Sequence, residues 1–141
     1  MNKWFVILML LVGAALQTHA QKRLSREEFV AKKQAYITRK ACLTEKEAVA
    51  FFPLYHEMCD KINHLNRIIA HNEWEMSEGT HRQEEYGRAL ARINNSRIEA
   101  AKVEKAYYEK FEKFLSKEKI YRIHMAEIEF HRCIIKGMVN K

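Results

Sequence analysis

The sequence predicts an all-α protein built from four helices. The chain of 141 residues contains only four glycines and one proline, so turn signals are scarce. Apolar residues recur every three or four positions over long stretches, which is the spacing of an amphipathic helix. Ser or Thr followed three positions later by Glu or Gln marks several helix starts. No segment shows the alternating pattern of a strand.

Before the first helix, residues 1–20 have the composition of an export signal. Lys3 provides a basic start, and residues 4–16 form an apolar run that is short for a membrane span. Ala20 is the small residue expected before the cleavage site. We therefore expect a mature chain of residues 21–141 that forms a single domain. An uncleaved membrane anchor is the alternative.

The first helix is expected over residues 26–42. Ser25 and Glu28 have the spacing of a capping box, in which each side chain bonds to the backbone N–H group of the other residue. Apolar and basic residues at helical spacing lie near one face of this helix, namely Phe29, Lys33, Tyr36, Ile37 and Lys40.

The second helix is expected over residues 45–76, after a capping box of Thr44 and Glu47. Pro53 removes one backbone hydrogen bond inside it, so we expect a bend and not a break. Two neighbouring apolar stripes widen its apolar arc to roughly 140°, where a single seam needs about 100°. They are Phe51, Tyr55, Ile62 and Ile69, and Leu54, Met58, Leu65 and Ile68. The second stripe should face another helix of this chain, a second subunit or a bound protein.

The third helix is expected over residues 81–114, after a capping box of Thr80 and Gln83. Its narrower apolar stripe consists of Tyr86, Leu90, Ile93, Ala100, Tyr107, Phe111 and Phe114. Arg97 and Glu104 interrupt the stripe, which indicates either an ion pair between helices or a partly hydrated seam. A helix of about 34 residues spans roughly 50 Å, which predicts long, bent helices in a thin, elongated layer.

The fourth helix is expected over residues 117–136. Ser116 is a favourable N-cap, because its hydroxyl can accept a hydrogen bond from a free N–H group of the first turn. Gly137 is expected just past the end of the helix, where glycine adopts the left-handed conformation without strain.

Two of these helix starts share one motif, 72 positions apart. In each, a leucine precedes a hydroxyl residue and charged residues follow: Leu43-Thr44-Glu45-Lys46-Glu47 and Leu115-Ser116-Lys117-Glu118-Lys119. Each leucine can pack on the fourth residue of its helix, Ala48 or Ile120, as a hydrophobic staple. The motif therefore fixes the angle at which the chain enters both helices.

The residues after both starts carry a family resemblance. The first motif continues to Glu47-Ala48-Val49-Ala50-Phe51-Phe52-Pro53-Leu54-Tyr55, and the second is followed by Glu127-Ile128-Glu129-Phe130. Here the sequence resembles the LTxxQ-motif family of exported helical proteins, the Spy/CpxP-like periplasmic chaperones and stress sensors. The resemblance covers most of the chain after residue 25. The glutamine that ends each family motif is replaced by Glu47 and by Lys119.

The resemblance implies a periplasmic location and a thin, cradle-shaped antiparallel homodimer. It implies an ATP-independent chaperone that binds unfolded or acidic protein segments on a basic and apolar helical surface. The alternative is an envelope-stress or heavy-metal sensor that docks on the periplasmic domain of a membrane signalling protein. Helical geometry places the expected client contacts at Met58, Lys61, Leu65, Arg67, Ile68, Met76, Arg88 and Arg92.

The charge balance agrees with acidic partners. Lys and Arg exceed Asp and Glu by 25 to 18, which gives a formal net charge of +7. Because nucleic acid is not an expected partner of an exported protein, acidic protein segments or anionic envelope surfaces are the better match. A basic surface that only keeps the protein soluble is the alternative.

Three cysteines allow at most one disulfide within a monomer. Cys42 and Cys59 are 17 positions apart on nearly one helix, roughly 25 Å, so they cannot be bridged. If the second and fourth helices run parallel, Cys59 and Cys133 could meet. The favoured interpretation is that these two are small buried hydrophobic residues.

One group of side chains on the fourth helix has the spacing of metal ligands. His124, Glu127 and His131 share a face and could bind a transition metal such as zinc. The favoured alternative is structural: Glu127 anchors a basic side chain, such as that of Arg97 or Lys40. The histidines of the second helix, His64 and His71, are expected on a solvated face. With no serine cluster and no glycine-rich phosphate loop, we expect neither catalytic residues nor an enzyme.

Overall fold

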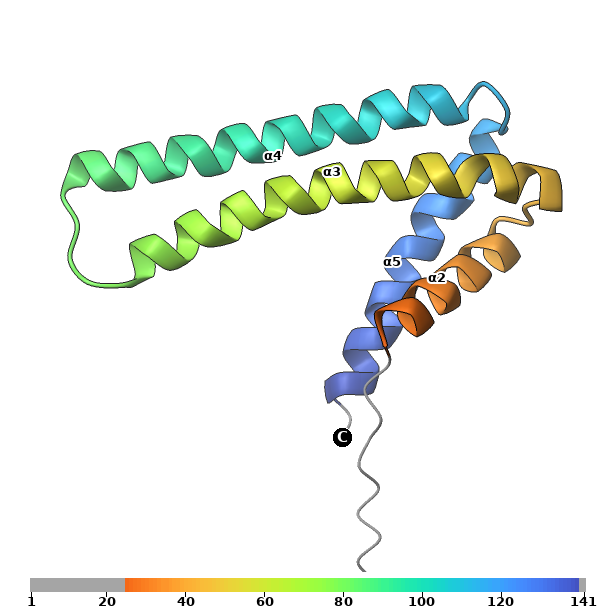
Figure 1. Cartoon of the computed structure of the whole chain (residues 1–141), viewed down its shortest axis with the longest axis horizontal. Coiled ribbons are helices and arrows are strands. Elements are labelled where there is room, and N and C mark those ends of the chain that lie inside the picture. Colours follow the sequence, from red (N-terminus) through yellow and green to blue (C-terminus); the bar gives the residue numbers. More distant parts are fainter. Residues whose placement is uncertain (1–24, 140–141) are drawn as a thin grey trace, which may run out of the picture.

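The computed structural model describes residues 25–139. Four α-helices follow one another along this part of the chain: α2, Arg26–Lys40; α3, Glu45–Ser77; α4, Gln83–Phe111; and α5, Lys117–Val139 (Figure 1). The described residues contain no strand, which confirms the predicted all-α class with four helices. The predicted export signal lies outside the described residues.

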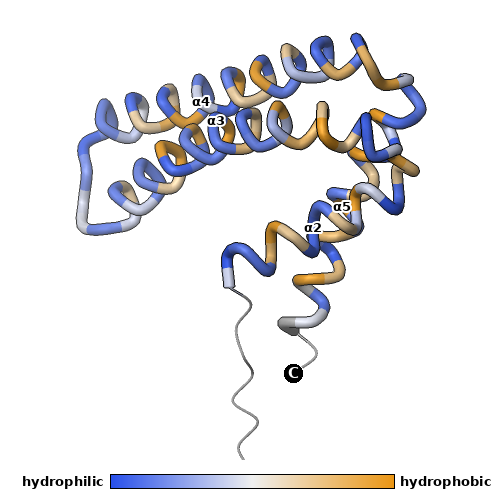
Figure 2. The backbone as a smooth tube through the Cα atoms, turned by 45° about the vertical axis from the view of Figure 1, so that its right-hand side comes forward, coloured by the Kyte–Doolittle hydropathy of each residue, from blue (hydrophilic) through white to orange (hydrophobic). Residues whose placement is uncertain are grey.

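The four helices form two pairs that meet at one end of the molecule. α3 and α4 run antiparallel as a long hairpin, and α2 and α5 lie side by side and leave the same end at an angle (Figure 1; Figure 2). We call this end the corner; it contains the α2–α3 connection, 41–44, and the α4–α5 connection, 112–116. The hairpin projects away from the corner and closes at residues 78–82.

The main apolar core lies at the corner, because all four helices contribute buried side chains there. Phe51 and Phe111 are almost completely buried, with ring centroids 4.8 Å apart. The other buried members of this core are Ile37, Ala41, Leu43, Tyr55, Met58, Tyr107, Leu115, Ile120, Ile123 and Ala126. Both leucines of the repeated motif belong to the core, as the hydrophobic-staple pattern predicts.

Three of the predicted helix starts are confirmed, and one is wrong. In the three, a backbone N–H group donates to the side-chain oxygen three residues earlier: Glu28 to Ser25 over 3.1 Å, Glu47 to Thr44 over 3.3 Å and Lys119 to Ser116 over 3.2 Å. The predicted cap at Thr80 is wrong, because α4 begins only at Gln83. The Arg82 N–H group donates to the Glu85 carboxylate over 2.8 Å, so Glu85 has the role expected of Gln83.

The helix ends differ from the predicted ones by a few residues. α2 ends at Lys40, and Cys42 has a φ of 50°, a left-handed conformation that stops the helix. α4 ends at Phe111 and is followed by a turn. The predicted stop at Gly137 is wrong, because α5 continues past it; glycine weakens a helix but does not break it. α3 is continuous through Pro53, as expected.

The buried face of α4 includes most of the predicted stripe, with Leu90 as the exception. Leu90, expected in this seam, is 59% exposed. The predicted members Ile93, Tyr107 and Phe111 are buried. Toward the far end of the hairpin, the buried positions Ala89, Ile93 and Ser96 alternate steps of four and three residues. That alternation averages 3.5 residues per turn, the period of two helices that wrap around each other. Arg97 forms the predicted ion pair between helices, with Glu73 at 3.3 Å.

Candidate functional site

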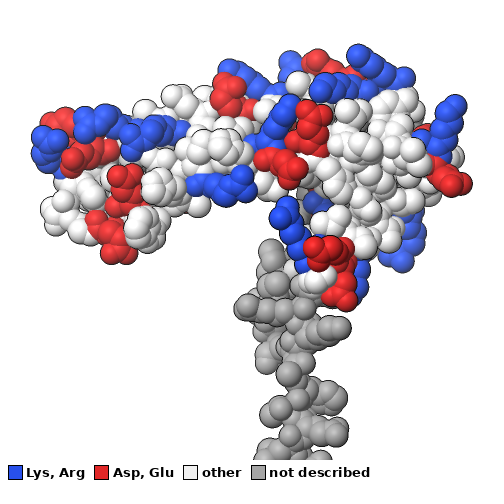
Figure 3. All heavy atoms as spheres, in the orientation of Figure 1, with Lys and Arg blue, Asp and Glu red and all other residues white. Residues whose placement is uncertain are grey.

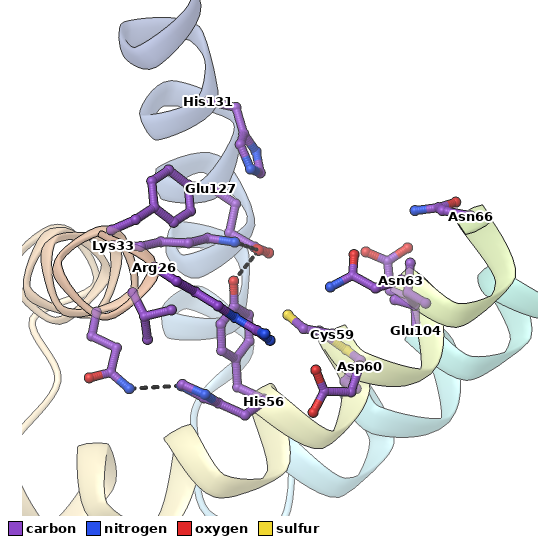
Figure 4. Close-up of a pocket in the computed structure, with 16 residues that line it drawn as sticks. Arg26, Lys33, His56, Cys59, Asp60, Asn63, Asn66, Glu104, Glu127 and His131 are labelled. Carbon is purple, nitrogen blue, oxygen red and sulfur yellow. Dashed lines mark hydrogen bonds and ion pairs between the residues drawn. The ribbon is translucent and has the colours of Figure 1, made fainter. Parts of the chain in front are cut away.

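A pocket of about 460 Å³ lies inside the corner, where α2 and α5 diverge from the hairpin (Figure 4). We call it the elbow pocket. Its floor is apolar and includes Phe29, Val30, Met58 and Ile62. Its polar lining comes from all four helices: Arg26, Lys33, His56, Asp60, Asn63, Asn66, Glu104, Glu127 and His131. A hollow of this size is in the range of pockets that hold small ligands or protein side chains.

Glu127 joins three helices at one side of the elbow pocket. Its carboxylate accepts a hydrogen bond from the Tyr55 hydroxyl on α3 and lies 3.1 Å from the Lys33 ammonium on α2. The two charged side chains are 15% and 19% exposed, so the pair is largely removed from water. Burial and the Glu127 carboxylate raise the pKa of Tyr55 well above its ordinary value, so the hydroxyl remains a donor. The expected partners of Glu127, Arg97 and Lys40, pair with other carboxylates.

The two repeated motifs contact each other. Lys119 Nζ lies 2.8 Å and 2.6 Å from the two carboxylate oxygens of Glu47, and this proximity lowers the pKa of the Glu47 carboxyl group. Glu47 is the third residue of α3 and Lys119 is the third residue of α5, 72 positions later. Tyr55 and Glu127, which are joined by a hydrogen bond, are also 72 positions apart. Equivalent positions of α3 and α5 therefore meet. The charged residues that end the two repeated motifs, Glu47 and Lys119, are therefore complementary and bind each other.

The three candidate metal ligands do not form a metal-binding group in the described part of the chain. Among residues 25–139, no three side chains of His, Cys, Asp or Glu are placed to hold a metal ion. Glu127 turns toward α2 and α3, the His124 ring lies 3.4 Å from the Tyr108 hydroxyl, and His131 lines the elbow pocket. The other histidine pair is exposed, as predicted: His64 and His71.

The three cysteines are free thiols. Cys42 and Cys133 are exposed, so the interpretation of Cys133 as a buried hydrophobic residue is wrong. Cys59 is half-buried and points into the elbow pocket (Figure 4). Burial raises the pKa of the Cys59 thiol, so this side chain is a weakly polar part of the lining and not a thiolate.

The structure does not bring the eight predicted client contacts together on one surface. Met58 is buried in the core at 3% exposure, so its assignment to an exposed surface is wrong. Lys61 and Leu65 line an open groove between α3 and α4, and Arg67 is exposed elsewhere on α3. Nearer the far end of the hairpin, three more predicted contacts line one pocket of about 190 Å³: Met76, Arg88 and Arg92. Ile68 is half-buried.

Sequence reasoning did not identify the elbow pocket. Its lining joins residues from α2 with residues of α4 and α5 that are far away in the chain. The local pattern does contain one signal, since Asp60, Asn63 and Asn66 form a polar stripe at helical spacing on α3. Only the angle between α2 and the hairpin shows that this stripe faces a hollow.

Comparison of the chain with known protein families, with curated proteins and with solved structures finds no match. No helix among the described residues combines the length and hydropathy needed to cross a membrane. The function is therefore argued from the geometry and the sequence motifs.

Proposed function

We propose that the protein is a periplasmic, ATP-independent folding chaperone of the Spy/CpxP-like type, which acts as a homodimer and holds unfolded segments against its helices. The observation that carries this proposal is the exposure of large apolar side chains along the hairpin of α3 and α4. Most of its contacts with the rest of the chain lie at the corner, so apolar side chains along its length remain partly open to solvent. Trp74 and Leu90 are 62% and 59% exposed, and Ile98 is 53% exposed.

Basic residues accompany these apolar side chains along the hairpin. Lys61 and Leu65 share one groove with Val103 and with three acidic residues, and Arg88 and Arg92 share a pocket with a methionine and two glutamates. Lys and Arg alternate with Asp and Glu over the visible face of the hairpin (Figure 3). Apolar contact is non-directional and tolerates many sequences, whereas lysine and arginine attract acidic segments over a longer range. This combination suits a surface that binds many unfolded proteins weakly.

An aggregation assay tests the proposal. We expect the purified protein, at equimolar ratio, to slow the aggregation of a chemically unfolded acidic client, as measured by light scattering. Neutralising the hairpin cations with Lys61→Gln, Arg88→Gln and Arg92→Gln should weaken this effect severalfold. A matched control, with Lys32→Gln, Lys46→Gln and Lys113→Gln, changes the net charge equally at exposed sites that form no ion pair among the described residues. No suppression by the unmodified protein would refute the proposal.

A further inference from the structure

The elbow pocket differs in charge from the rest of the molecule. The whole chain has a formal net charge of +7. The hairpin side of the pocket instead presents two carboxylates, Asp60 on α3 and Glu104 on α4, beside the amides of Asn63 and Asn66 (Figure 4). Neither carboxylate forms an ion pair with another described residue. The interhelical ion pair expected for Glu104 is therefore absent; its carboxylate accepts a hydrogen bond from Tyr108 of the same helix over 3.1 Å.

The lysine and the arginine of the pocket both come from α2, and the side chain of Arg26 extends from there toward Cys59 and Asp60 (Figure 4). Lys33 is held by Glu127 at 3.1 Å, so the charges of these two residues balance each other. A ligand that approaches the hairpin side therefore meets two unpaired carboxylates above an apolar floor.

We propose that the elbow pocket binds client segments in which a lysine or arginine adjoins an apolar side chain. The apolar side chain would cover the floor formed by Phe29, Val30 and Ile62. The long aliphatic stem of the basic residue would follow the wall, with its charged end at Asp60 and Glu104. Amide side chains can donate to and accept from an extended main chain, and three line this pocket: Gln34, Asn63 and Asn66.

The overall positive charge does not oppose this preference at contact distance. At physiological ionic strength the screening length is about 8 Å, so exposed lysines elsewhere on the molecule act weakly inside the pocket. Two carboxylates in direct contact with a bound cation therefore outweigh them. A chaperone with this pocket would hold basic segments at the corner, in addition to the acidic segments that the exposed lysines and arginines of the molecule attract. This inference rests on the proposed function, because it specifies which client segments bind at the corner.

Fluorescence anisotropy with short labelled peptides tests this assignment. Two peptides of equal length are compared, each with a central leucine, one flanked by lysines and the other by glutamates. We expect the elbow-pocket variant Asp60→Asn with Glu104→Gln to bind the lysine peptide about fivefold more weakly than the unmodified protein, since solvent-accessible ion pairs contribute modestly. The matched control, Glu78→Gln with Glu84→Gln, removes the same charge from exposed sites outside the pocket and should bind normally. Arg26→Gln should strengthen binding of the lysine peptide.

The outcomes separate this inference from the proposed function. Equal losses in the elbow-pocket variant and its control, or stronger binding of lysine peptide by the pocket variant, would overturn the assignment. If the unmodified protein suppresses aggregation but the pocket variant binds the lysine peptide normally, the inference fails and the chaperone function stands. If aggregation is not suppressed at all, the proposed function fails, and the inference about clients fails with it.

Discussion

The corner and the free half of the hairpin, residues 68–97, contain parts of the same two helices but are held together differently. At the corner, the Phe51 ring stacks on Tyr55 and lies at an angle to Phe111, and these rings belong to a core to which α2 and α5 also contribute. In the free half, the buried residues are Asn72, Ala89, Ile93 and Ser96, two of which are polar. A helix pair with so few buried apolar groups opens more easily than a four-helix core. The difference indicates that the corner provides the stability and the free half provides accessible surface.

The largest expected effect comes from the centre of the corner. Phe51→Ala should reduce the free energy of unfolding by about 3–5 kcal/mol, because it removes a fully buried ring and leaves a cavity. Urea denaturation followed by circular dichroism measures this. Leu90→Ala, in the free half, removes a side chain that is 59% exposed and should cost less than about 1 kcal/mol. Similar losses for the two variants would show that the regions do not differ in packing.

The next largest effect should come from the largely buried ion pair of the corner. Glu127→Gln leaves the Lys33 ammonium without its anion at 15% exposure, and should cost about 1–3 kcal/mol. The comparable pair of the hairpin, between Arg97 and Glu73, is 60% and 54% exposed. Glu73→Gln should therefore change the stability by less than about 1 kcal/mol. Thermal unfolding of both variants makes the comparison, and a larger loss for Glu73→Gln would contradict it.

A smaller effect, an increase in the free energy of unfolding, is expected at Asn72, a buried polar residue between α3 and α4 in the free half. The Asn72 amide donates to the Ile68 carbonyl over 2.7 Å and accepts from Arg92 Nε, which itself remains half-exposed. Asn72→Leu exchanges these modest hydrogen bonds for apolar burial and should stabilise the hairpin by about 1 kcal/mol. Slower hydrogen exchange of amides in the free half, with unchanged exchange at the corner, would report the gain. Faster exchange there would show that Asn72 specifies the pairing of α3 and α4.

The smallest expected effect is the acid response of the motif contact. Lys119 lowers the pKa of the Glu47 carboxyl group below its ordinary value of 4.5. The contribution of this pair is therefore complete above pH 4.5 and is lost as the pH falls through the lowered value of the folded state. Glu47→Gln with Lys119→Gln should lose less stability than the unmodified protein between pH 5 and pH 3, as measured by urea midpoints. An identical decline would mean that the pair does not couple α5 to α3.

Much of the fold follows from local patterns, and the candidate site does not. The helix starts at Ser25, Thr44 and Ser116 are predictable because each depends on residues within three positions. Met58 was predicted to contact clients but is buried, and Leu90 was predicted to lie in the apolar seam but is exposed. Each depends on which side of its helix the partner occupies, and an apolar arc of roughly 140° does not specify this.

The amino-acid sequence by itself determined the all-α class, the number of helices, three of the four start signals and the aromatic content of the core. The tertiary structure alone decided that Glu127 meets Lys33, that Glu47 meets Lys119 and that α2 leaves the hairpin at an angle that opens the elbow pocket. The physical reason is range. Capping and helical periodicity act between residues a few positions apart, whereas these two ion pairs join side chains 72 or more positions apart, whose approach depends on how whole helices pack.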